Sequence, residues 1–460
     1  MVNPERRMKK YFLASATLAL LAPIGAWADT ASDIQALRAE LDAVRKAYEA
    51  RLQALEQRLI AAESQAAPGK APNTTQAPSA AVAPANANSL NPAISMVLSG
   101  TYSRTSRDPA DYRISGFQLP SGAEVGPGTR GFSLAETELS FSANIDPWLR
   151  GVTHIALHPD NAVSVEEAYV QTTSLGSGLS LKAGRFLSGV GYLNSQHAHT
   201  WDFVDAPLAY QALLGTQLGD DGVQLKWIAP TDQYIELGAE LARGRSFPGS
   251  GNSRNGAGMA SLGVHTGGDI GESHSWRAGV SVLSAKADGQ ALDTLNSSGT
   301  AVGNSFTGKT RLWIADGVWK WAPNGNASRT SFKLQGEYLR STARGELVYD
   351  ATGAAIADGY RAVQSGWYVQ GVYQFMPRWR LGLRTERLSP GTPYLGINAS
   401  ALSGTGYQPR KNSLMLDFNP SEFSRIRLQL ASDQARDGRA DRQLFIQYQM
   451  SLGAHGAHGF

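Results

Sequence analysis

Along residues 93–460, apolar side chains recur at every second position in one segment after another. Leu139, Phe141 and Ala143 form one such series, and others follow until Leu452. The positions between them mostly carry Ser, Gln, Gly, Lys, Arg and Glu. This period is that of a β-strand with one apolar and one polar face. It predicts an all-β fold for the whole region.

Two kinds of connection alternate between these segments. Short turns rich in Pro, Asp, Asn and Gly occur at 146–147, 174–178, 230–232, 267–273, 323–326, 376–377 and 419–422. The other connections are mostly longer and lie at 104–131, 159–162, 187–220, 244–256, 286–308, 341–362, 389–411 and 435–440. Seven short turns and eight outer loops join about sixteen antiparallel strands and leave both ends on one side. This is typical of a transmembrane β-barrel of the outer membrane, with its apolar phase toward lipid.

The region before residue 93 follows other patterns. Residues 1–28 have a basic start, an apolar run and a small-x-small site, which predict a signal peptide; a membrane anchor, the alternative, needs about 20 apolar residues. In 29–65 apolar residues lie three and four apart, which predicts a periplasmic coiled coil, with a single surface helix as the alternative. Residues 66–92 are rich in Ala, Pro and Ser and are expected to form a flexible linker. A leader and a tether of this kind also argue against a soluble sandwich, the other all-β fold with this pattern.

Composition excludes several classes of function. The chain has 42 Lys and Arg against 39 Asp and Glu, a net charge of +3, and residues 1–28 carry that whole excess. A mature chain near neutrality lacks the basic excess that a nucleic-acid partner requires. Since there is no Cys, a disulfide framework, a thiol nucleophile and a thiolate metal site are excluded as well. We expect no cofactor.

Two segments carry a family resemblance. The sequences VEEAYV at 165–170 and LKAGRF at 181–186 resemble the strand pair of phosphate-selective porins, and this implies a sixteen-stranded, homotrimeric porin. The segments PLAY at 207–210 and 221–232, with the GAHGAH tail, are similar to a proteobacterial group labelled zinc-regulated outer-membrane receptors. The terminal Phe460 resembles the C-terminal signal read by the outer-membrane assembly machinery.

The region before the barrel also bears on how transport is driven. A receptor driven by the TonB energy-coupling protein carries a plug domain inside a barrel of about 22 strands. Here only the coiled coil and the linker precede the barrel, so we expect a passive channel for small hydrophilic or ionic solutes in the outer membrane of a Gram-negative bacterium. The coiled coil would associate with its own copies, or alternatively with peptidoglycan or a periplasmic protein. Uptake of a metal ion such as zinc is the alternative function, and a barrel enzyme is a more distant one.

The loop at 187–220 is the richest in polar and aromatic side chains and is expected to fold inward and narrow the pore. The residues predicted at this constriction are Arg185, Asn194, His197, His199, Asp202 and Asp205. The polar phase of the strands supplies the predicted pore wall, namely Arg150, Glu167, Lys182, Lys226, Arg277, Arg311, Arg380, Arg384, Arg425 and Arg427. A field between the two loop acids and the basic wall would sort ions by charge; wall residues that are merely solvated or paired are the alternative.

Histidine spacing suggests a metal site. His197 and His199, with Asp202 as an oxygen ligand, have donor types that zinc or nickel accepts. A hydrogen-bonded loop cluster is the alternative. Two further pairs with close spacing are His154/His158 and His455/His458.

Catalysis would need a nucleophile, a base and an acid that converge. Ser188, His197 and Asp202 lie in one loop, but no Gly-x-Ser-x-Gly elbow surrounds the serine. No catalytic residue is therefore predicted.

Overall fold

The computed structural model describes residues 93–135, 137–251, 255–402, 406–438 and 440–453. The chain divides into two units, Met1–Ala83 and Pro84–Phe460, and every described residue belongs to the second. The predicted signal peptide (1–28), coiled coil (29–65), linker (66–92) and assembly signal at Phe460 lie outside the described residues. In the described part, no helix is long and apolar enough to span a membrane.

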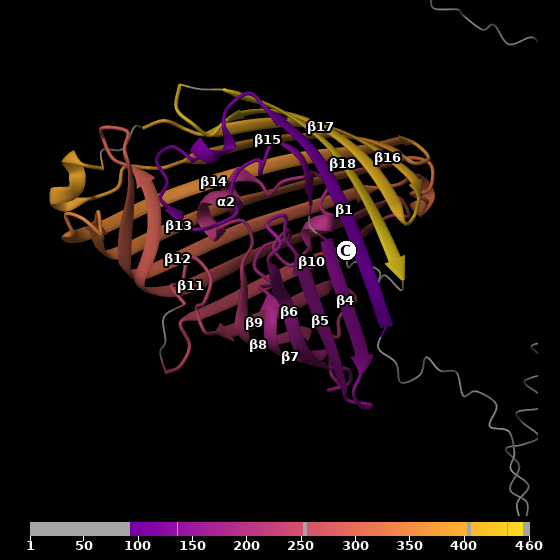
Figure 1. The fold of residues 1–460 in the computed structure, drawn as a ribbon. Helices are drawn as coiled ribbons and strands as arrows, with labels where there is room; N and C mark the ends of the chain where they lie inside the picture. Colours follow the sequence, from indigo (N-terminus) through magenta and orange to yellow (C-terminus); the bar gives the residue numbers. More distant parts are fainter. Residues whose placement is uncertain (1–92, 136, 252–254, 403–405, 439, 454–460) are drawn as a thin grey trace, which may run out of the picture. The chain divides into compact units, whose positions relative to one another are not determined.

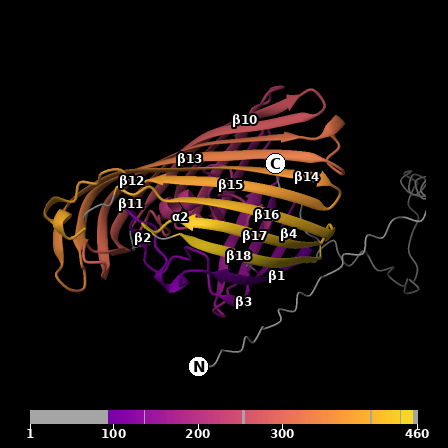
Figure 2. The ribbon, with the colours of Figure 1, turned by 90° about the horizontal axis from the view of Figure 1, so that it is seen from above.

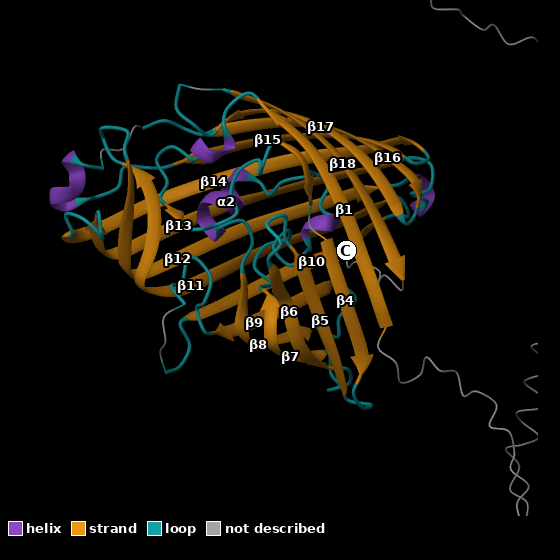
Figure 3. Cartoon of the chain, viewed as in Figure 1, coloured by secondary structure: helices purple, strands orange, loops and turns teal. Residues whose placement is uncertain are grey.

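Sixteen strands form a closed antiparallel barrel, as predicted (Figures 1 and 3). They are β1 (Ala93–Thr105), β4 (Thr137–Asn144), β5 (Leu149–Leu157), β6 (Val163–Thr172), β7 (Leu179–Leu187), β8 (Gly219–Ile228), β9 (Tyr234–Ala242), β10 (Met259–Ile270), β11 (His274–Leu295), β12 (Ala301–Trp321), β13 (Ser331–Tyr349), β14 (Ile356–Met376), β15 (Trp379–Ser389), β16 (Arg410–Ser421), β17 (Ser424–Gln434) and β18 (Asp441–Gly453). Each of β4 to β17 pairs with the next strand in the chain. β1 closes the ring by pairing with β18 on one side and β4 on the other. Figure 2 shows β15 to β18 and then β1 in succession along the wall.

The remaining elements are short and lie in the connections. They are β2 (Leu119–Pro120), β3 (Gly131–Leu134), the 3-10 helices η1 (Pro109–Asp111), η2 (Ala198–Thr200), η3 (Pro323–Gly325) and η4 (Gly396–Ser400), and the α-helix α2 (Leu208–Leu214). β3 extends the pairing of β1, and β2 lies against β11. Both belong to the first outer loop, which therefore contacts the barrel at two places.

The connections alternate between short turns and outer loops, as the sequence predicts, with boundaries shifted by a few residues. Two predicted loops, 286–308 and 341–362, are wrong in extent, because β11 to β14 run on as paired strands. β11 pairs with β12 out to Leu295, and β13 pairs with β14 out to Tyr349. One side of the barrel is consequently built from strands of 19 to 22 residues, whereas β4 to β7 have 8 to 10.

The two phases of each strand face opposite ways. On β15, Leu381 and Leu383 point outward and are 40% and 61% exposed, while Arg384 and Glu386 point inward and are buried. Exposed apolar residues and buried charged residues reverse the order of a soluble protein. The apolar exterior is the surface that a transmembrane barrel presents to lipid.

The loop between β7 and β8, residues 188–218, lies inside the barrel, and we call it the lumen loop. It holds η2 and α2, and α2 lies against the inner faces of β13, β14 and β15. Every residue of α2 is buried. Its Leu208 and Leu214 join inward residues such as Leu312 and Leu339 in one apolar cluster. The core of this protein therefore lies between the loop and one wall.

A charge placed on the outer phase tests the inside-out arrangement. We expect Leu383→Arg to lower the free energy of unfolding by roughly 2–4 kcal/mol, since it moves a cation into lipid. Asn144→Arg, on the inward phase of β4, should change it by less than about 1 kcal/mol. Urea unfolding of the purified protein in lipid vesicles measures both. Equal losses in the two variants would contradict the assignment of faces.

Candidate pore and its lumen loop

A line of inward residues, each the direct partner of the next across neighbouring strands, runs from β9 to β18. In order its members are Glu236, His265, Gly279, Asp316, Glu337, Tyr368, Glu386, Lys411, Asp433 and Asp441. We call this line the acidic row, because six of the ten are carboxylates. Apart from Gly279, all are 8% exposed or less. Buried carboxylates need hydrogen-bond donors or cations, and the lumen loop supplies many of them.

Glu337 lies at the centre of this attachment. Its carboxylate accepts hydrogen bonds from the backbone N–H groups of Tyr192 and Leu193 at 3.1 and 3.0 Å. The hydroxyls of Tyr210 and Tyr368 donate to it at 2.8 and 2.6 Å. Burial and then the Glu337 charge raise the pKa of Tyr210 well above its ordinary value, so the hydroxyl remains a donor. One side chain thus holds two separate parts of the loop.

Two more carboxylates hold the loop backbone. Glu386 accepts from the N–H of Leu208 at 2.5 Å, at the start of α2. Glu240, on β9, accepts from the N–H of Gly189 at 2.8 Å and from the hydroxyl of Ser188 at 2.5 Å. The loop is therefore bound near its beginning and at its helix, by strands far apart in the sequence.

The acids of the loop itself form ion pairs with cations of the wall. Asp202 contacts Lys333 and, at 3.4 Å, Arg380. Asp205 contacts Arg384 at 2.6 Å and Lys411 at 2.5 Å. Burial raises the pKa of both aspartates, but these cations lower it further, and the net shift in pKa is downward for each. Both carboxylates thus remain ionised and bound, and they form buried ion pairs where a field across an open pore was predicted.

Between its attachments near its beginning and at its helix, the loop reaches β4, β5 and β6 through His197. The Nδ1 atom of His197 lies 2.9 Å from Glu138, and its Nε2 atom lies 2.9 Å from Glu167. Glu166 is 3.2 Å from the same Nδ1. Burial lowers the pKa of His197, but the hydrogen bonds with these three glutamates outweigh it and raise the pKa well above its ordinary value. The loop is therefore attached to opposite parts of the wall.

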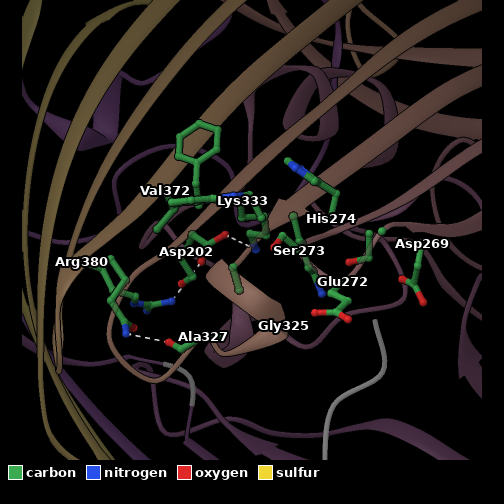
Figure 4. Close-up of a pocket in the computed structure, with 18 residues that line it drawn as sticks. Asp202, Asp269, Glu272, Ser273, His274, Gly325, Ala327, Lys333, Val372 and Arg380 are labelled. Atoms are coloured by element: carbon green, nitrogen blue, oxygen red, sulfur yellow. Dashed lines mark hydrogen bonds and ion pairs between the residues drawn. The ribbon is translucent and has the colours of Figure 1, made fainter.

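A cavity of about 550 Å³ lies where Asp202 meets the short turns of β10–β11 and β12–β13 (Figure 4). Its lining mixes acids, Asp269 and Glu272, with cations, Lys333 and Arg380. Figure 4 shows Lys333 next to Asp202 at its inner end, with Asp269 and Glu272 on the opposite side. The cavity thus lies beside two short turns and next to the lumen loop's Asp202.

The predicted constriction residues are buried or turned away from the lumen. Arg185 is wrong, because it shares the outward phase of β7 with Ala183 and pairs with Asp221 at 2.7 Å. Asn194 is fully buried and joins the two ends of the loop, since its amide bonds Ser188 and Leu218. His197, His199, Asp202 and Asp205 are each buried against the wall.

The predicted wall residues fall into three groups. Arg150, Lys182, Lys226 and Arg277 face the lumen and are at least partly exposed. Arg380, Arg384, Arg425, Arg427 and Glu167 face inward but are engaged with the loop or with Asp417. Arg311 is wrong, because it shares the exposed outward phase of β12 with Trp313.

One side-chain grouping that the sequence predicts, and one that it only raises, do not form. As a metal ligand beside His197 and His199, Asp202 is wrong, since Lys333 and Arg380 occupy its carboxylate. The serine, histidine and aspartate considered for catalysis also have separate partners, because Ser188 binds Glu240 while His197 binds the glutamates of β4 and β6.

Sequence reasoning missed Lys411, which pairs with Asp205, and Asp433, which pairs with Lys411. Their signal was present, since Lys411 shares a strand phase with Met415 and Asp417. Lys411 lies at the outer end of its strand, where a single charged residue can belong either to the inward face of the strand or to the loop, and the sequence does not separate these two cases.

With this geometry in hand, comparison with known proteins places the chain in a family. No family model matches it. A protein of Aquifex aeolicus (strain VF5), described as uncharacterized, is 31% identical over 410 residues, covering 82% of this chain and 82% of that protein. The chain belongs to the same family as this Aquifex protein. The shared region is long enough to include most of the barrel, so we expect the Aquifex relative to have the same architecture.

Solved outer-membrane proteins have a similar arrangement of strands. The loop L8 deletion mutant of OmpT from Vibrio cholerae has a TM-score of 0.48 at 11% identity, covering 79% of this chain and 100% of that one. An anion-selective porin from Comamonas acidovorans has a TM-score of 0.48 at 10% identity, covering 78% of this chain and 99% of that one. The channel DcaP of Acinetobacter baumannii has a TM-score of 0.46 at 11% identity, covering 78% of this chain and 96% of that one. At these scores the likenesses bear on neither solute nor mechanism.

Removal of the central carboxylate tests how the loop is held. Glu337→Ala leaves two backbone donors and two tyrosine hydroxyls without their acceptor, so we expect the free energy of unfolding to fall by roughly 3 kcal/mol or more. The loop should then fluctuate, and single-channel current should become noisier. Glu272→Ala, at an exposed turn, is the control and should change neither value. Quiet current from Glu337→Ala would show that the loop is held by other contacts.

Proposed function

We propose that the protein is an outer-membrane porin, a passive channel for small hydrophilic or ionic solutes that the lumen loop narrows. The observation that carries this proposal is a closed sixteen-stranded barrel with an apolar exterior and a loop bound inside it. A barrel of this strand number is wide enough for an aqueous lumen. The loop occupies part of that width and leaves the rest for solutes.

The charges left open in the lumen support a preference for anions. The carboxylates of Glu240, Glu337 and Glu386 are occupied by donors of the loop. In contrast, Lys182 forms no ion pair with any described residue and lies over the ring of Tyr169, 4.2 Å from its centroid. Among the described residues Arg150 donates to the Ser142 hydroxyl at 2.9 Å. The loop thus covers these acids and leaves cations accessible along β5 and β7, where they attract anions.

Planar-bilayer recordings test both statements. The purified protein should give stable steps of conductance that need no energy source, and reversal potentials in asymmetric KCl should show that chloride is the preferred ion. We expect Lys182→Glu to shift the reversal potential toward potassium, because it reverses a lumen charge. Arg311→Glu, on the outer face, is the matched control and should leave the reversal potential unchanged. No conductance at all would overturn the channel function.

We also propose a homotrimer in which the short strands β4 to β7 face the neighbouring subunits. Their outward phase includes four small residues, Ala143, Gly151, Ala168 and Ala183, which lie around a shallow hollow of the surface beside Phe141, Ile145 and Val170. Small side chains let two walls approach closely, as they do between helices in membranes. The chain's ends are assigned as proposed above: Phe460 to the assembly machinery and residues 29–65 to a periplasmic coiled coil.

The interface proposal predicts the effect of one bulky residue. Ala168→Trp should convert the trimer to monomers on native gels while the barrel stays folded, because an indole cannot fit between closely packed walls. Gly371→Trp, outward on the long side of the barrel, should leave the trimer intact. A trimer that tolerates Ala168→Trp would place the interface elsewhere.

A further inference from the structure

Three histidines and three glutamates meet where the lumen loop touches β4, β5 and β6. We call this group the histidine cluster, and its members are Glu138, His154, Glu166, Glu167, His197 and His199. The porin function gives these residues no role beyond attachment of the loop. Their donor types, imidazole nitrogen and carboxylate oxygen, are those that Zn²⁺, Ni²⁺ and Cu²⁺ accept.

The carboxylate of Glu138 faces the same atom of all three rings. Its Oε1 atom lies 2.7 Å from Nδ1 of His154, and its Oε2 atom lies 2.9 Å from Nδ1 of His197 and 3.5 Å from Nδ1 of His199. The side chain of Glu138 is 2% exposed. Three rings that each turn Nδ1 toward one buried carboxylate form a concave set of ligands of mixed N and O type.

Glu167 lies on the opposite side of two of these rings. Its Oε2 atom is 2.9 Å from Nε2 of His197 and 3.8 Å from Nε2 of His154. When a histidine binds a metal through one nitrogen, its other N–H usually donates to a carboxylate or a carbonyl, and this fixes the ring. Glu167 is placed to accept from Nε2 of His197 and lies at ion-pair distance from Nε2 of His154. The Nδ1 atoms of both rings point to Glu138 and are available to the ion.

The backbone of β6 is adapted to this convergence. The pairing of β5 with β6 shifts register by one residue, since His154 pairs with Glu167 while Ile155 pairs with Val165. Such a bulge lets neighbouring residues of one strand act on the same side, which a regular strand forbids. As a result both Glu166 and Glu167 reach His197, at 3.2 and 2.9 Å. Two buried carboxylates, Glu138 and Glu167, and the 22% exposed Glu166 thus surround the rings and attract a divalent cation.

The spacing also fits a metal after a small closure. One ligand atom each from Glu138, His154 and His197 lie within 4.8 Å of one another. Zinc bonds of about 2.1 Å hold neighbouring ligands roughly 3.4 Å apart in a tetrahedron. A contraction of about 1 Å or a little more would therefore complete the site, with His199 or Glu166 available as a fourth ligand.

We propose that the histidine cluster binds one divalent transition-metal ion, held by His154, His197 and Glu138, with Glu167 as the outer acceptor. His197 belongs to the lumen loop, and His154, Glu138 and Glu167 belong to the wall. The ion therefore holds the part of the loop around His197 against the barrel. The site itself stands without the channel function, and only its effect on current rests on the proposed porin.

The test is a zinc titration of the full chain, purified from membranes and stripped with chelator. All samples carry His455→Ala and His458→Ala, so that the tail adds no site. Calorimetry with ZnCl2 should give one ion per chain, and His154→Ala or His197→Ala should weaken binding at least tenfold. His158→Ala, nearby but bonded to Ser164 and Glu124, is the matched control and should bind zinc as the parent does. MgCl2 should give no heat, since Mg²⁺ prefers oxygen ligands.

Glu138→Gln provides a second variant that keeps the side-chain shape, and heat-dependent migration on gels checks that each barrel is folded. Current through the same samples separates the metal-site proposal from the porin proposal. In the parent, zinc should quiet fluctuations of the open channel, and in His197→Ala it should not. A conducting protein that binds no zinc, or variants that bind as tightly as the parent, would overturn the metal site and leave the porin. Zinc binding without any current would overturn the porin and support the site.

Discussion

The hydrogen bonds between backbone N–H groups of the lumen loop and carboxylates of the barrel wall are the interaction on which this structure depends. A loop inside a barrel has buried donors that strands cannot satisfy, and an inward carboxylate has acceptors that need partners. At Glu240, Glu337 and Glu386 the carboxylates accept hydrogen bonds from these N–H groups, so donors and acceptors are satisfied together. Without the loop these acids would have to be hydrated in the lumen, and without them the N–H groups of Gly189, Tyr192, Leu193 and Leu208 would lose their acceptors.

The same exchange explains the charge of the pathway. An inspection of the wall alone gives nearly balanced charges, with acids and bases on the same phases. The loop covers several of these acids, because its N–H groups donate hydrogen bonds to their carboxylates. Its own aspartates remove the cations Arg384 and Lys411 on the other side of the barrel. What remains open near Arg150 and Lys182 is positive, so selectivity follows from the path of the loop as much as from the strands.

The sequence was sufficient for the barrel and insufficient for its interior. Alternation and turn chemistry give the sixteen strands, because a strand's two faces have to meet lipid and lumen. The alternation assigned the wrong face to Arg185, which lies near the end of β7, and to Arg311. Arg311 is at the middle of β12 but close to the end of the loop predicted at 286–308. The partners of Asp202 are Lys333 on β13 and Arg380 on β15, and Asp202 reaches them because it lies just after η2. The spacing of residues within the loop does not predict which strands the loop contacts. The bulge at Glu166 and Glu167 does leave a sign, since the outward apolar residues change from Val163 and Val165 to Ala168 and Val170. One such change within ten residues does not show which side chains the bulge brings together.

Geometry gives the acidic row one more consequence. Partners across a sheet lie along a line perpendicular to the strands, and the strands of a barrel are tilted by about 40° from its axis. The row therefore climbs the wall as a ramp and does not lie as a ring at one depth. The loop that is seated on it slopes with it, and the open positive side faces that slope over much of the passage. An ion crossing this lumen would therefore meet charged groups at successive depths along the barrel axis, and not one ring of charge at a single depth.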